Sequence, residues 1–445
     1  MEPDRGCTHS SGPNVTDRSR QEHLTVKRSR THRCRPAERG TPAPPDAGLP
    51  IARRPWVAHH RYVRPFSLYI HIPYCDSKCP YCDFNSYAVK QWPEADYRDA
   101  LIAELRTYAG LPAWREGAVQ TVFVGGGTPS LFAPETIAAL LDAAFELWPR
   151  SAPRIEITLE ANPGTVDAAK LRGFAAAGVT RMSFGVQSFE PRHLVQLGRI
   201  HGPAEAIAAI DGARRAGFDA ISLDLMFAIP GQAQSEWEAD LALAAALRPT
   251  HISAYGLTYE DGTAFATRRR SGSLVPVPEE AEVAMFTRTR ALLGMHGYVQ
   301  YEISNYAVPG FECAHNLNYW RAGTYLGVGA GAHSFCREPD PGRRWSNEKN
   351  PGRYIERVRR IGHARVDEEA LSLEQARGEF VFLGLRCRAG IDGSDFARRF
   401  GIGFARAYPH AEAFVRDGYL EHAAGRWRLT ERGMVYADSI FTTFL

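Results

Sequence analysis

The chain has 445 residues, of which 44% are hydrophobic and 23% charged, with a formal net charge of +3; this balance is typical of a globular protein that buries one large core or several smaller ones. No apolar run approaches the length of a bilayer span, which excludes a membrane-spanning protein. Eight cysteines are too few for a disulfide scaffold in so long a chain, and this usage favours a reducing compartment, the cytoplasm.

Residues 1–65 form a basic segment without hydrophobic periodicity. The segment holds thirteen Lys and Arg against six Asp and Glu, whereas the rest of the chain holds 40 against 44. Its Arg, Ser, Thr and Pro content predicts a disordered tail, with a transit peptide or an overlong start as alternatives. Because the remaining chain is slightly acidic, we expect no nucleic-acid partner.

The first structured segment joins a predicted strand at 67–73 to a C-x3-C-x2-C pattern made by Cys75, Cys79 and Cys82. An iron–sulfur cubane needs four iron ligands, so three thiolates leave one iron open to a small molecule. Catalytic zinc sites keep a vacant position by the same logic. A structural zinc site would need a fourth ligand here, Asp83 or His71. We therefore predict a [4Fe-4S] cluster with one open iron, and keep zinc as the alternative.

Further strand-like segments follow the loop, and amphipathic helical patterns separate them. The predicted strands are 121–125, 155–160, 181–187, 220–227 and 251–258, and the helical patterns include 134–148, 167–177, 203–216 and 235–247. Such alternation predicts repeated βα units with a parallel sheet. Six units predict an incomplete (βα)6 barrel, with its site where polar and glycine residues gather at the carboxyl ends of the strands.

The pattern changes after about residue 365. Helical segments are followed by a predicted hairpin, formed by residues 418–420 and 426–430, and by a last helix from Glu431. We predict a smaller winged-helix-like α+β domain at 365–445, after a partial barrel at 66–300 and a barrel extension at 301–364. No basic recognition helix is visible, so the domain is expected to serve packing rather than DNA binding.

The motifs at successive strand ends resemble those of the radical S-adenosylmethionine (SAM) superfamily, whose first strand ends in such a cysteine loop. More narrowly, YIHIPYC, GGGTPS, GVQSF, GRIH and DLMFAIPGQ resemble the coproporphyrinogen III oxidase-like branch over about residues 65 to 440. The resemblance implies that Arg199 pairs with the SAM carboxylate and that Tyr69 approaches the sulfonium. The full set of implied SAM contacts is Tyr69, Gly126, Gly127, Thr128, Glu160, Gln187, Arg199 and Asp224.

That branch contains true oxidases and HemW-type haem chaperones, and two features favour the chaperones. The oxidases carry an additional cysteine two positions after the loop, where this chain has Phe84. They also have a structured N-terminal segment that helps to close the substrate site, which the predicted tail does not offer.

A second resemblance lies in residues 301–320, where His315, Asn316, Tyr319 and Trp320 match the H-N-x-x-Y-W motif of the chaperones. Imidazole is a good axial ligand for haem iron, and aromatic rings can stack on a porphyrin. Cys313 is a second candidate ligand, and a buried packing histidine is the alternative interpretation. Residues 329–333 (GAGAH) are expected to line the same cavity.

These features together predict a chaperone that binds haem and delivers it to acceptor haemoproteins, including membrane-associated respiratory proteins. Its cofactors would be a [4Fe-4S] cluster, SAM and haem, with a homodimer as one option for the assembly. The enzymatic alternative is oxygen-independent coproporphyrinogen III oxidation, in which reductive SAM cleavage gives a radical that abstracts hydrogen from a propionate and releases carbon dioxide. DNA-linked regulation through the C-terminal domain is a third class, which the charge pattern disfavours.

Overall fold

The computed structural model describes residues 64–445. The predicted tail therefore lies outside the described residues, apart from Arg64 and Pro65, which begin the first strand. No helix of the described part is long and apolar enough to cross a membrane.

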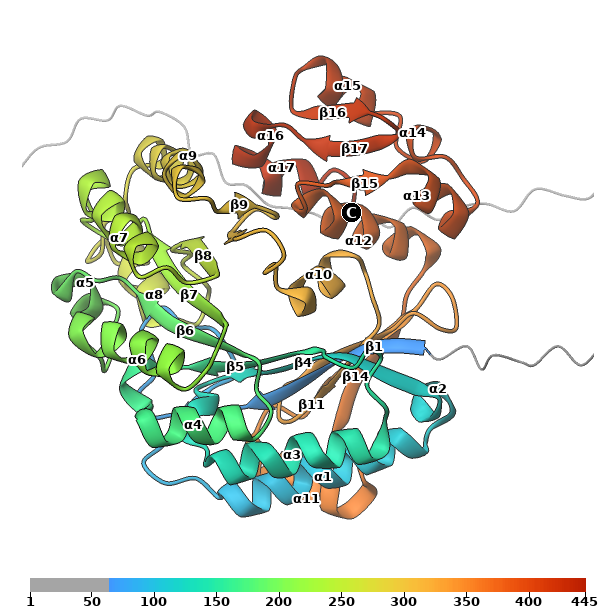
Figure 1. The fold of residues 1–445 in the computed structure, drawn as a ribbon. Coiled ribbons are helices and arrows are strands. Elements are labelled where there is room, and N and C mark those ends of the chain that lie inside the picture. Colours follow the sequence, from blue (N-terminus) through green and yellow to red (C-terminus); the bar gives the residue numbers. More distant parts are fainter. Residues whose placement is uncertain (1–63) are drawn as a thin grey trace, which may run out of the picture. The chain divides into compact units, whose positions relative to one another are not determined.

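One twelve-stranded sheet organises the described chain (Figure 1). Its centre consists of six parallel strands in chain order, and these confirm the predicted partial barrel. They are β1 (Arg64–Ile72), β4 (Gly117–Gly126), β5 (Glu156–Ala161), β6 (Arg181–Gln187), β7 (Ala220–Phe227) and β8 (His251–Gly256). Their apolar residues are almost wholly buried, as expected for parallel strands covered on both faces.

Shorter strands extend the sheet at both ends. β11 (Tyr325–Val328) pairs in parallel with β1, and β12 (His333–Cys336), β13 (Arg343–Asn347) and β14 (Arg365–Ala370) follow it antiparallel. At the other end, β10 (Asn305–Ala307) pairs antiparallel with β8 and with β9 (Val299–Gln300). β1 is thus an interior strand, with a neighbour on each side.

Helices cover the outer face of the sheet because each buries one apolar stripe against it. In α3, for example, Ile137, Leu140, Leu141 and Ala144 recur at helical spacing and are buried. The covering helices are α1 (Glu94–Gly110), α3 (Pro134–Leu147), α4 (Ala168–Ala176), α6 (Pro203–Arg215), α7 (Gln234–Ala246), α9 (Glu279–Met295) and α11 (Pro351–Ile361). Short elements connect them: β2 (Tyr74–Cys75), β3 (Tyr87–Ala88), α2 (Pro112–Arg115), α5 (Pro191–Gln196), α8 (Ala264–Arg270) and the 3₁₀ turns Pro129–Leu131 and Pro163–Thr165.

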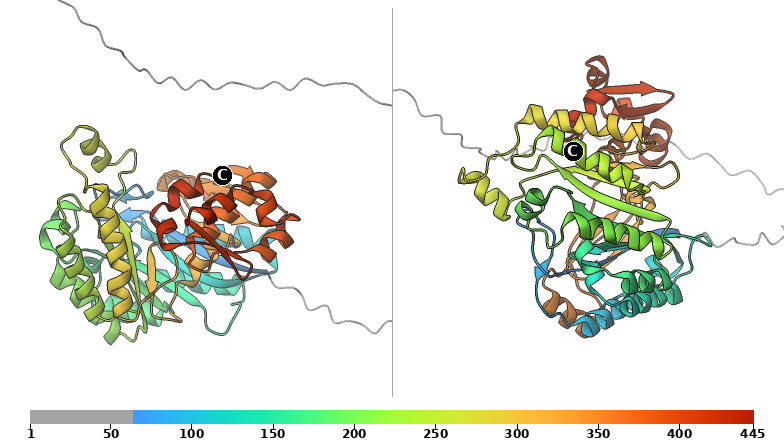
Figure 2. Two further views of the ribbon diagram at one scale, coloured as in Figure 1. Left: turned by 90° about the horizontal axis from the view of Figure 1, so that it is seen from above. Right: turned by 60° about the vertical axis from the view of Figure 1, so that its left-hand side comes forward.

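The C-terminal elements have a core of their own, which includes Phe396, Phe404 and Trp427. The elements are grouped together in every view of Figures 1 and 2. A three-stranded antiparallel sheet of β15 (Ile391–Asp392), β17 (Arg426–Leu429) and β16 (Leu420–Ala423) packs with helices, which confirms the winged-helix-like class. The helices are α12 (Leu373–Arg386), α13 (Gly393–Phe400), α14 (Phe404–Ala407), α15 (Ala411–Arg416), α16 (Glu431–Val435) and α17 (Ala437–Phe441).

The second core predicts a localised stability effect. Phe396 is fully buried and contacts Phe400 and Phe404, with ring centroids 4.9 and 5.3 Å away. Phe396→Ala should lower the free energy of unfolding by about 3–5 kcal/mol, because the cavity left behind cannot collapse fully. Urea denaturation followed by circular dichroism measures the loss. The exposed Leu373→Ala should serve as the neutral control, and an equal loss in both variants would contradict a separate C-terminal core.

Candidate functional site

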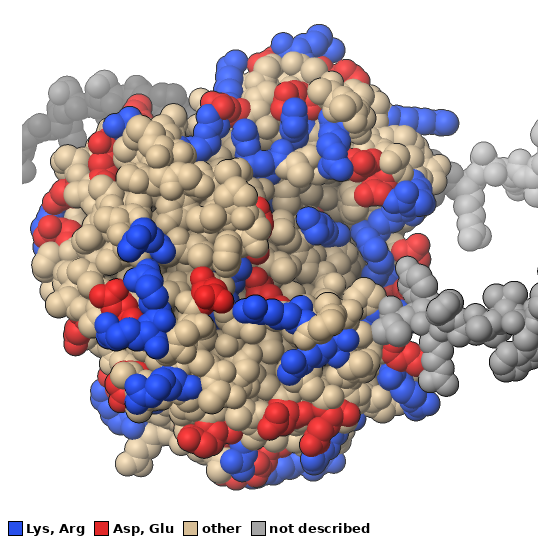
Figure 3. All heavy atoms as spheres, viewed as in Figure 1, with Lys and Arg blue, Asp and Glu red and all other residues tan. Residues whose placement is uncertain are grey.

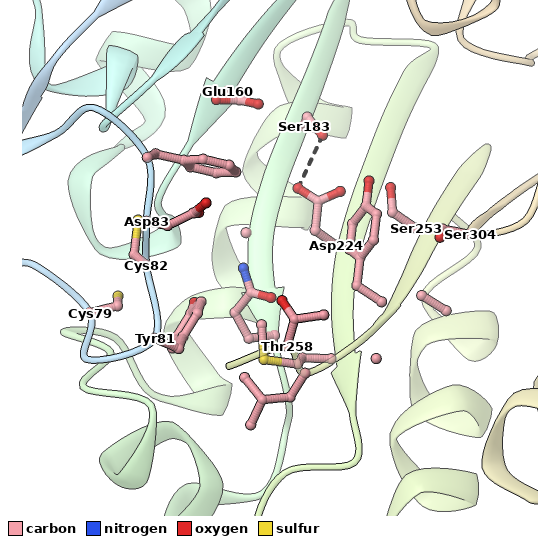
Figure 4. A pocket seen from close by; sticks show the side chains of 18 of the residues that line it. Cys79, Tyr81, Cys82, Asp83, Glu160, Ser183, Asp224, Ser253, Thr258 and Ser304 are labelled. Carbon is pink, nitrogen blue, oxygen red and sulfur yellow. Dashed lines mark hydrogen bonds between the residues drawn. The ribbon is translucent and has the colours of Figure 1, made fainter. Parts of the chain in front are cut away.

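The carboxyl ends of the central strands border a cavity of about 1050 Å³. The cysteine loop forms one wall, and residues along β5, β6 and β7 form the floor opposite it. Figure 4 shows Cys79 and Cys82 on the loop, facing the side from which Glu160 and Asp224 project. The sheet thus brings the cysteine loop and Asp224, which are far apart in the sequence, to one cavity.

All three predicted metal ligands line this cavity, and each sulfur has a polar neighbour. The Thr128 hydroxyl donates to Cys75 Sγ at 3.5 Å, and the Arg199 guanidinium donates to Cys79 Sγ at 3.5 Å. Burial raises the pKa of the Cys75 and Cys82 thiols. Without a bound cation these two thiols therefore stay protonated at neutral pH, and a metal would be needed to hold them as thiolates.

The glycines after β4 allow the cysteine loop to approach closely. A Cβ on Gly127 would lie 2.6 Å from the Tyr74 carbonyl and 2.9 Å from Cys75 Sγ, and a Cβ on Gly126 would lie 2.6 Å from the His71 ring. The Gly127 amide donates to the Ile72 carbonyl at 2.8 Å. These glycines are thus required by backbone packing against the loop, at a point where Gly126 also adopts φ of 122°.

The donor set fits an iron–sulfur cubane better than the zinc alternative. His71 cannot be a fourth ligand, because its Nε2 donates to the Asn85 carbonyl at 2.9 Å and its Nδ1 accepts from the Tyr69 hydroxyl at 2.9 Å. Asp83 is exposed. Within residues 64–445 no group of three or more His, Cys, Asp or Glu side chains is placed to hold a single ion. A cubane is larger than a single ion and needs its three thiolates farther apart.

Two buried carboxyl groups lie on the cavity floor. Burial raises the pKa of Glu160 to about 8, and the nearby Asp224 adds to the shift, although the Gly126 amide donates to Glu160 at 3.0 Å and opposes it. Burial also raises the pKa of Asp224 to about 6, opposed by hydroxyl groups of Ser253 and Ser183. Arg199 also opposes the shift of the Asp224 pKa, but less than burial raises it, and no cation contributes to the pKa of Glu160. The pair therefore suits a positively charged ligand.

Gln187 and Arg199 complete this part of the wall. Gln187 ends β6 with φ of 71°, a left-handed conformation that is uncommon for a side chain of this kind and is found at functional sites. Arg199 donates to the Gly185 carbonyl at 2.6 Å, while its buried Nε has no partner. The motif's His201 instead joins two strand ends, through Asn162 Oδ1 and the Val186 carbonyl, both at 3.1 Å.

Tyr69 is the one implied SAM contact that does not line the cavity. Its hydroxyl is bonded to His71, and its ring stacks on Phe123 at 6.3 Å. Phe123 does line the cavity, so Tyr69 supports the wall from behind. Gly126, Gly127, Thr128, Glu160, Gln187, Arg199 and Asp224 all line it.

The predicted haem motif lies on the short helix α10 (Ala314–Trp320), between the main sheet and α12 (Figure 1). Glu156 holds the beginning of this helix, accepting from the His315 amide at 3.0 Å and from the Cys313 thiol at 3.4 Å. Glu156 also forms a buried ion pair with Arg181 at 3.0 Å. Burial raises the pKa of Cys313 well above its ordinary value, so this second candidate ligand is a protonated thiol.

Both ring nitrogens of His315 are hydrogen-bonded. Nδ1 lies 2.8 Å from the Thr121 hydroxyl, which itself donates to Ser67, so Nδ1 carries the proton. Nε2 lies 2.9 Å from the Tyr319 hydroxyl and therefore accepts from it. Burial lowers the pKa of His315 to about 3, so the ring is neutral. Iron ligation by His315 would require one of these bonds to break.

The other motif residues divide between the cavity and the C-terminal elements. Asn316 lines the cavity, as Cys313 does, whereas His315, Tyr319 and Trp320 do not. The Arg386 guanidinium of α12 lies 4.5 Å from the Trp320 ring centre. The motif helix therefore links strand β4 to the C-terminal elements.

Residues 329–333 were predicted to line the cavity, and this prediction is wrong. The Gly329 amide donates to the buried carboxylate of Glu104 at 3.0 Å, and a Cβ on Gly331 would touch Asn85. The segment is therefore packed between α1 and the strand-to-loop junction after β1. Its glycines serve this close packing.

Sequence reasoning missed the part of the wall that comes from outside the barrel motifs. Val283 and Phe286 of α9, Ile303, Arg386 and residues 434–439 all line the cavity. None of these residues lies in a recognisable motif. The only sequence signal is the apolar run within each helix, which indicates burial but not a place in the cavity wall. These residues reach the cavity through tertiary packing.

A partial barrel with three cysteines after its first strand and a polar cavity at its strand ends defines a radical SAM protein. The family model of the Radical SAM superfamily matches residues 69–244, and that of the HemN C-terminal domain matches residues 371–436.

Curated relatives narrow this class. "Heme chaperone HemW" of Escherichia coli (strain K12) is 41% identical over 391 residues, covering 86% of this chain and 98% of the relative. The protein of the same name from Bacillus subtilis (strain 168) is 35% identical over 380 residues, covering 85% and 99%. The chain belongs to the heme chaperone HemW family of radical SAM proteins.

A solved structure also resembles the whole described fold. It is coproporphyrinogen III oxidase (HemN) from Escherichia coli, a radical SAM enzyme, with a TM-score of 0.74 and 25% identity over 86% of this chain and 90% of that chain. Membership of the superfamily implies a [4Fe-4S] cluster and SAM as cofactors.

The cysteine loop generates the first site prediction. Replacing Cys75, Cys79 or Cys82 by Ala should abolish the brown chromophore and about four irons per chain, because three corners of the cluster depend on them. Iron analysis and absorbance of anaerobically reconstituted protein measure this. Cys336→Ala and Cys387→Ala are matched controls that should keep full iron. Full iron in Cys79→Ala would contradict the ligand assignment.

The carboxyl groups generate a second prediction. Glu160→Ala and Gln187→Ala should each weaken SAM binding about 5- to 100-fold, since a lost buried hydrogen bond costs about 1–3 kcal/mol, while iron content stays unchanged. Calorimetry measures the affinity. Unchanged affinity in both variants would show that these residues do not contact SAM.

The pH dependence of SAM binding follows from the raised pKa of Glu160, about 8. This carboxyl is protonated at pH 6 and ionises toward pH 8, so a cationic ligand gains its charge partner as the pH rises. The affinity should therefore increase from pH 6 to pH 8. Glu160→Gln should leave a shallower increase, carried by Asp224 alone; an identical profile in this variant would contradict the charge pairing.

Proposed function

We propose that this protein is a haem chaperone, which binds haem and passes it to acceptor haemoproteins, and that its radical SAM core holds a [4Fe-4S] cluster and SAM. The observation that carries the proposal is the match to proteins named heme chaperone, which extends over 98% of the Escherichia coli relative. Coproporphyrinogen III oxidation is the competing function, supported by the fold of HemN.

Phe84 supports the carrier over the oxidase. It occupies the position at which the oxidases of this branch carry an additional cysteine. The residue is 63% exposed and lines the cavity wall. A phenyl ring can neither ligate iron nor carry a proton. The chain therefore lacks a thiol at this point of the loop.

We assign the cofactor roles as follows. Cys75, Cys79 and Cys82 ligate the cluster, which when bound supplies electrons and an open iron. Glu160 and Asp224 hold the cationic part of SAM, and Gln187 and Thr128 orient it by hydrogen bonds. The buried Arg199, which already bonds Gly185, pairs with the SAM carboxylate through its planar guanidinium.

The charge of the cavity wall also supports a carrier over an enzyme for a porphyrinogen with four carboxylates. Its acidic residues outnumber its basic ones, and the basic Arg181 and Arg386 are paired with Glu156 and Glu302. A tetra-acid would meet like charges in a partly desolvated space, which is unfavourable. On the face shown in Figure 3, acidic and basic side chains are interspersed.

The function is tested by two assays on anaerobically reconstituted protein. The wild type should bind haem in an absorbance titration without SAM turnover, and it should not convert coproporphyrinogen III. SAM-dependent formation of protoporphyrinogen IX by the wild type would overturn the carrier function. Absence of haem binding would overturn it as well.

The haem ligand is tested separately. If His315 ligates iron, His315→Ala should shift the haem spectrum and weaken binding, while the cluster stays intact. Cys313→Ala tests the thiol, and a change in this variant alone would replace imidazole by sulfur. Thr121→Val is the matched control, because the Thr121 hydroxyl is hydrogen-bonded to His315 Nδ1. This variant also removes a hydrogen bond of the ring, but it keeps the imidazole, so the haem spectrum should stay unchanged if His315 is the ligand.

A further inference from the structure

The cavity has two unlike halves. The inner half carries the cysteines, Glu160 near the end of β5 and Asp224 inside β7. The outer half is formed by α9, by the loop before β10 and by the junction of α16 and α17, as the lining residues of the cavity show. We call this outer half the outer chamber and define it by Val283, Phe286, Ile303, Met434, Val435 and Tyr436.

The outer chamber is lined by apolar and aromatic side chains, although part of it is open to solvent. Tyr436 is 49% exposed. Phe286 packs against both the barrel core and the C-terminal core, and Ile303 packs against the latter. A thioether and aromatic rings adapt well to a flat apolar ligand. Such a wall is unlike the polar floor beneath the cysteine loop.

Acidic groups stand beside this apolar wall. Glu279, Glu282 and Asp438 line the same part of the cavity, and burial together with Glu279 raises the pKa of Glu282. The nearby Arg386 is engaged by Glu302 at 3.4 Å and by the Trp320 ring. Arg388 donates to Met434 Sδ at 3.4 Å but does not itself line the cavity, so the acidic side chains outnumber Arg386 on this part of the wall. The chamber therefore favours an uncharged edge.

We propose that the outer chamber binds the apolar edge of haem, with the propionates turned toward the opening. This inference rests on the proposed function. Haem carries its two propionates on one side of the macrocycle and vinyl and methyl groups on the other, so it can enter edge-first without burying a charge. Coproporphyrin III carries a propionate on every pyrrole ring. Any edge that it inserted would bring a carboxylate against the acidic groups.

The motif helix α10 has a different role in this arrangement. His315 is bonded on both ring nitrogens and Trp320 lies under Arg386. Of the motif residues, Asn316 alone reaches the cavity wall. The helix thus supports the cavity from beneath, while the macrocycle contacts α9 and the α16–α17 junction.

Two chamber variants test the site on opposite walls. Val435→Ser with Tyr436→Ala removes apolar surface on the C-terminal wall, and Val283→Ser removes it on α9. Matched controls are Met295→Ala on α9 and Leu373→Ala on α12, which are 70% and 47% exposed and lie outside the cavity wall. Haem affinity by absorbance titration should fall about tenfold in the double variant and about threefold in Val283→Ser, and should not change in the controls. Iron content and SAM affinity should stay at wild-type values.

Porphyrin competition gives the second measurement. Metal-free protoporphyrin IX should bind the wild type and compete with haem, as followed by its fluorescence, whereas coproporphyrin III should not compete at the same concentrations. Equal competition by the two porphyrins would overturn the orientation that we propose. Wild-type haem affinity in both chamber variants would overturn the chamber while leaving the carrier function intact. A wild type that binds no haem would instead overturn the proposed function itself.

Discussion

The close approach of two backbone segments, the end of β1 and the end of β4, is the constraint on which the site depends. The Gly127 and Thr128 amides donate to the carbonyls of Ile72 and Tyr74, both at 2.8 Å. This contact is possible only without side chains at Gly126 and Gly127. It fixes the start of the cysteine loop against the sheet, so that Cys75 faces the cavity. The ligand geometry is therefore set by strand pairing rather than by the loop alone.

The same contact links the loop to the charged floor. The Gly126 amide donates to Glu160 at 3.0 Å, so the glycine that packs under the loop also orients the carboxyl group opposite it. His71, near the end of β1, holds the end of the cysteine loop through a hydrogen bond to the Asn85 carbonyl. A substitution of Gly126 or His71 is expected to disturb cluster and SAM binding together, because both residues pack against the cysteine loop, whereas Glu160 touches the loop only through the Gly126 amide.

A second structural theme is the connection between the barrel and the C-terminal elements. Glu156 holds the first turn of α10 within the barrel, and Arg386 covers the last residue of that helix from α12. The C-terminal elements then supply the outer wall of the cavity through residues 434–439. Haem delivery needs a binding site that an acceptor protein can reach. The outer wall of the cavity is more accessible to an acceptor than His315, which is buried.

The sequence by itself determined the six parallel strands, and it placed the three cysteines of the loop and several strand residues at the cavity. These features are local: each strand carries its own apolar run, and parallel strands place their carboxyl ends at one edge wherever they pair. Glu160 could be assigned to that edge, and Asp224 to the interior of its strand, without knowing their contacts. Only the tertiary structure decided that Tyr69 lies behind Phe123, that His315 is bonded on both nitrogens, and that α9 and residues 434–439 complete the wall. These depend on contacts between segments far apart in the chain, which no local pattern records, because a buried histidine and a ligand histidine look alike until their neighbours are known.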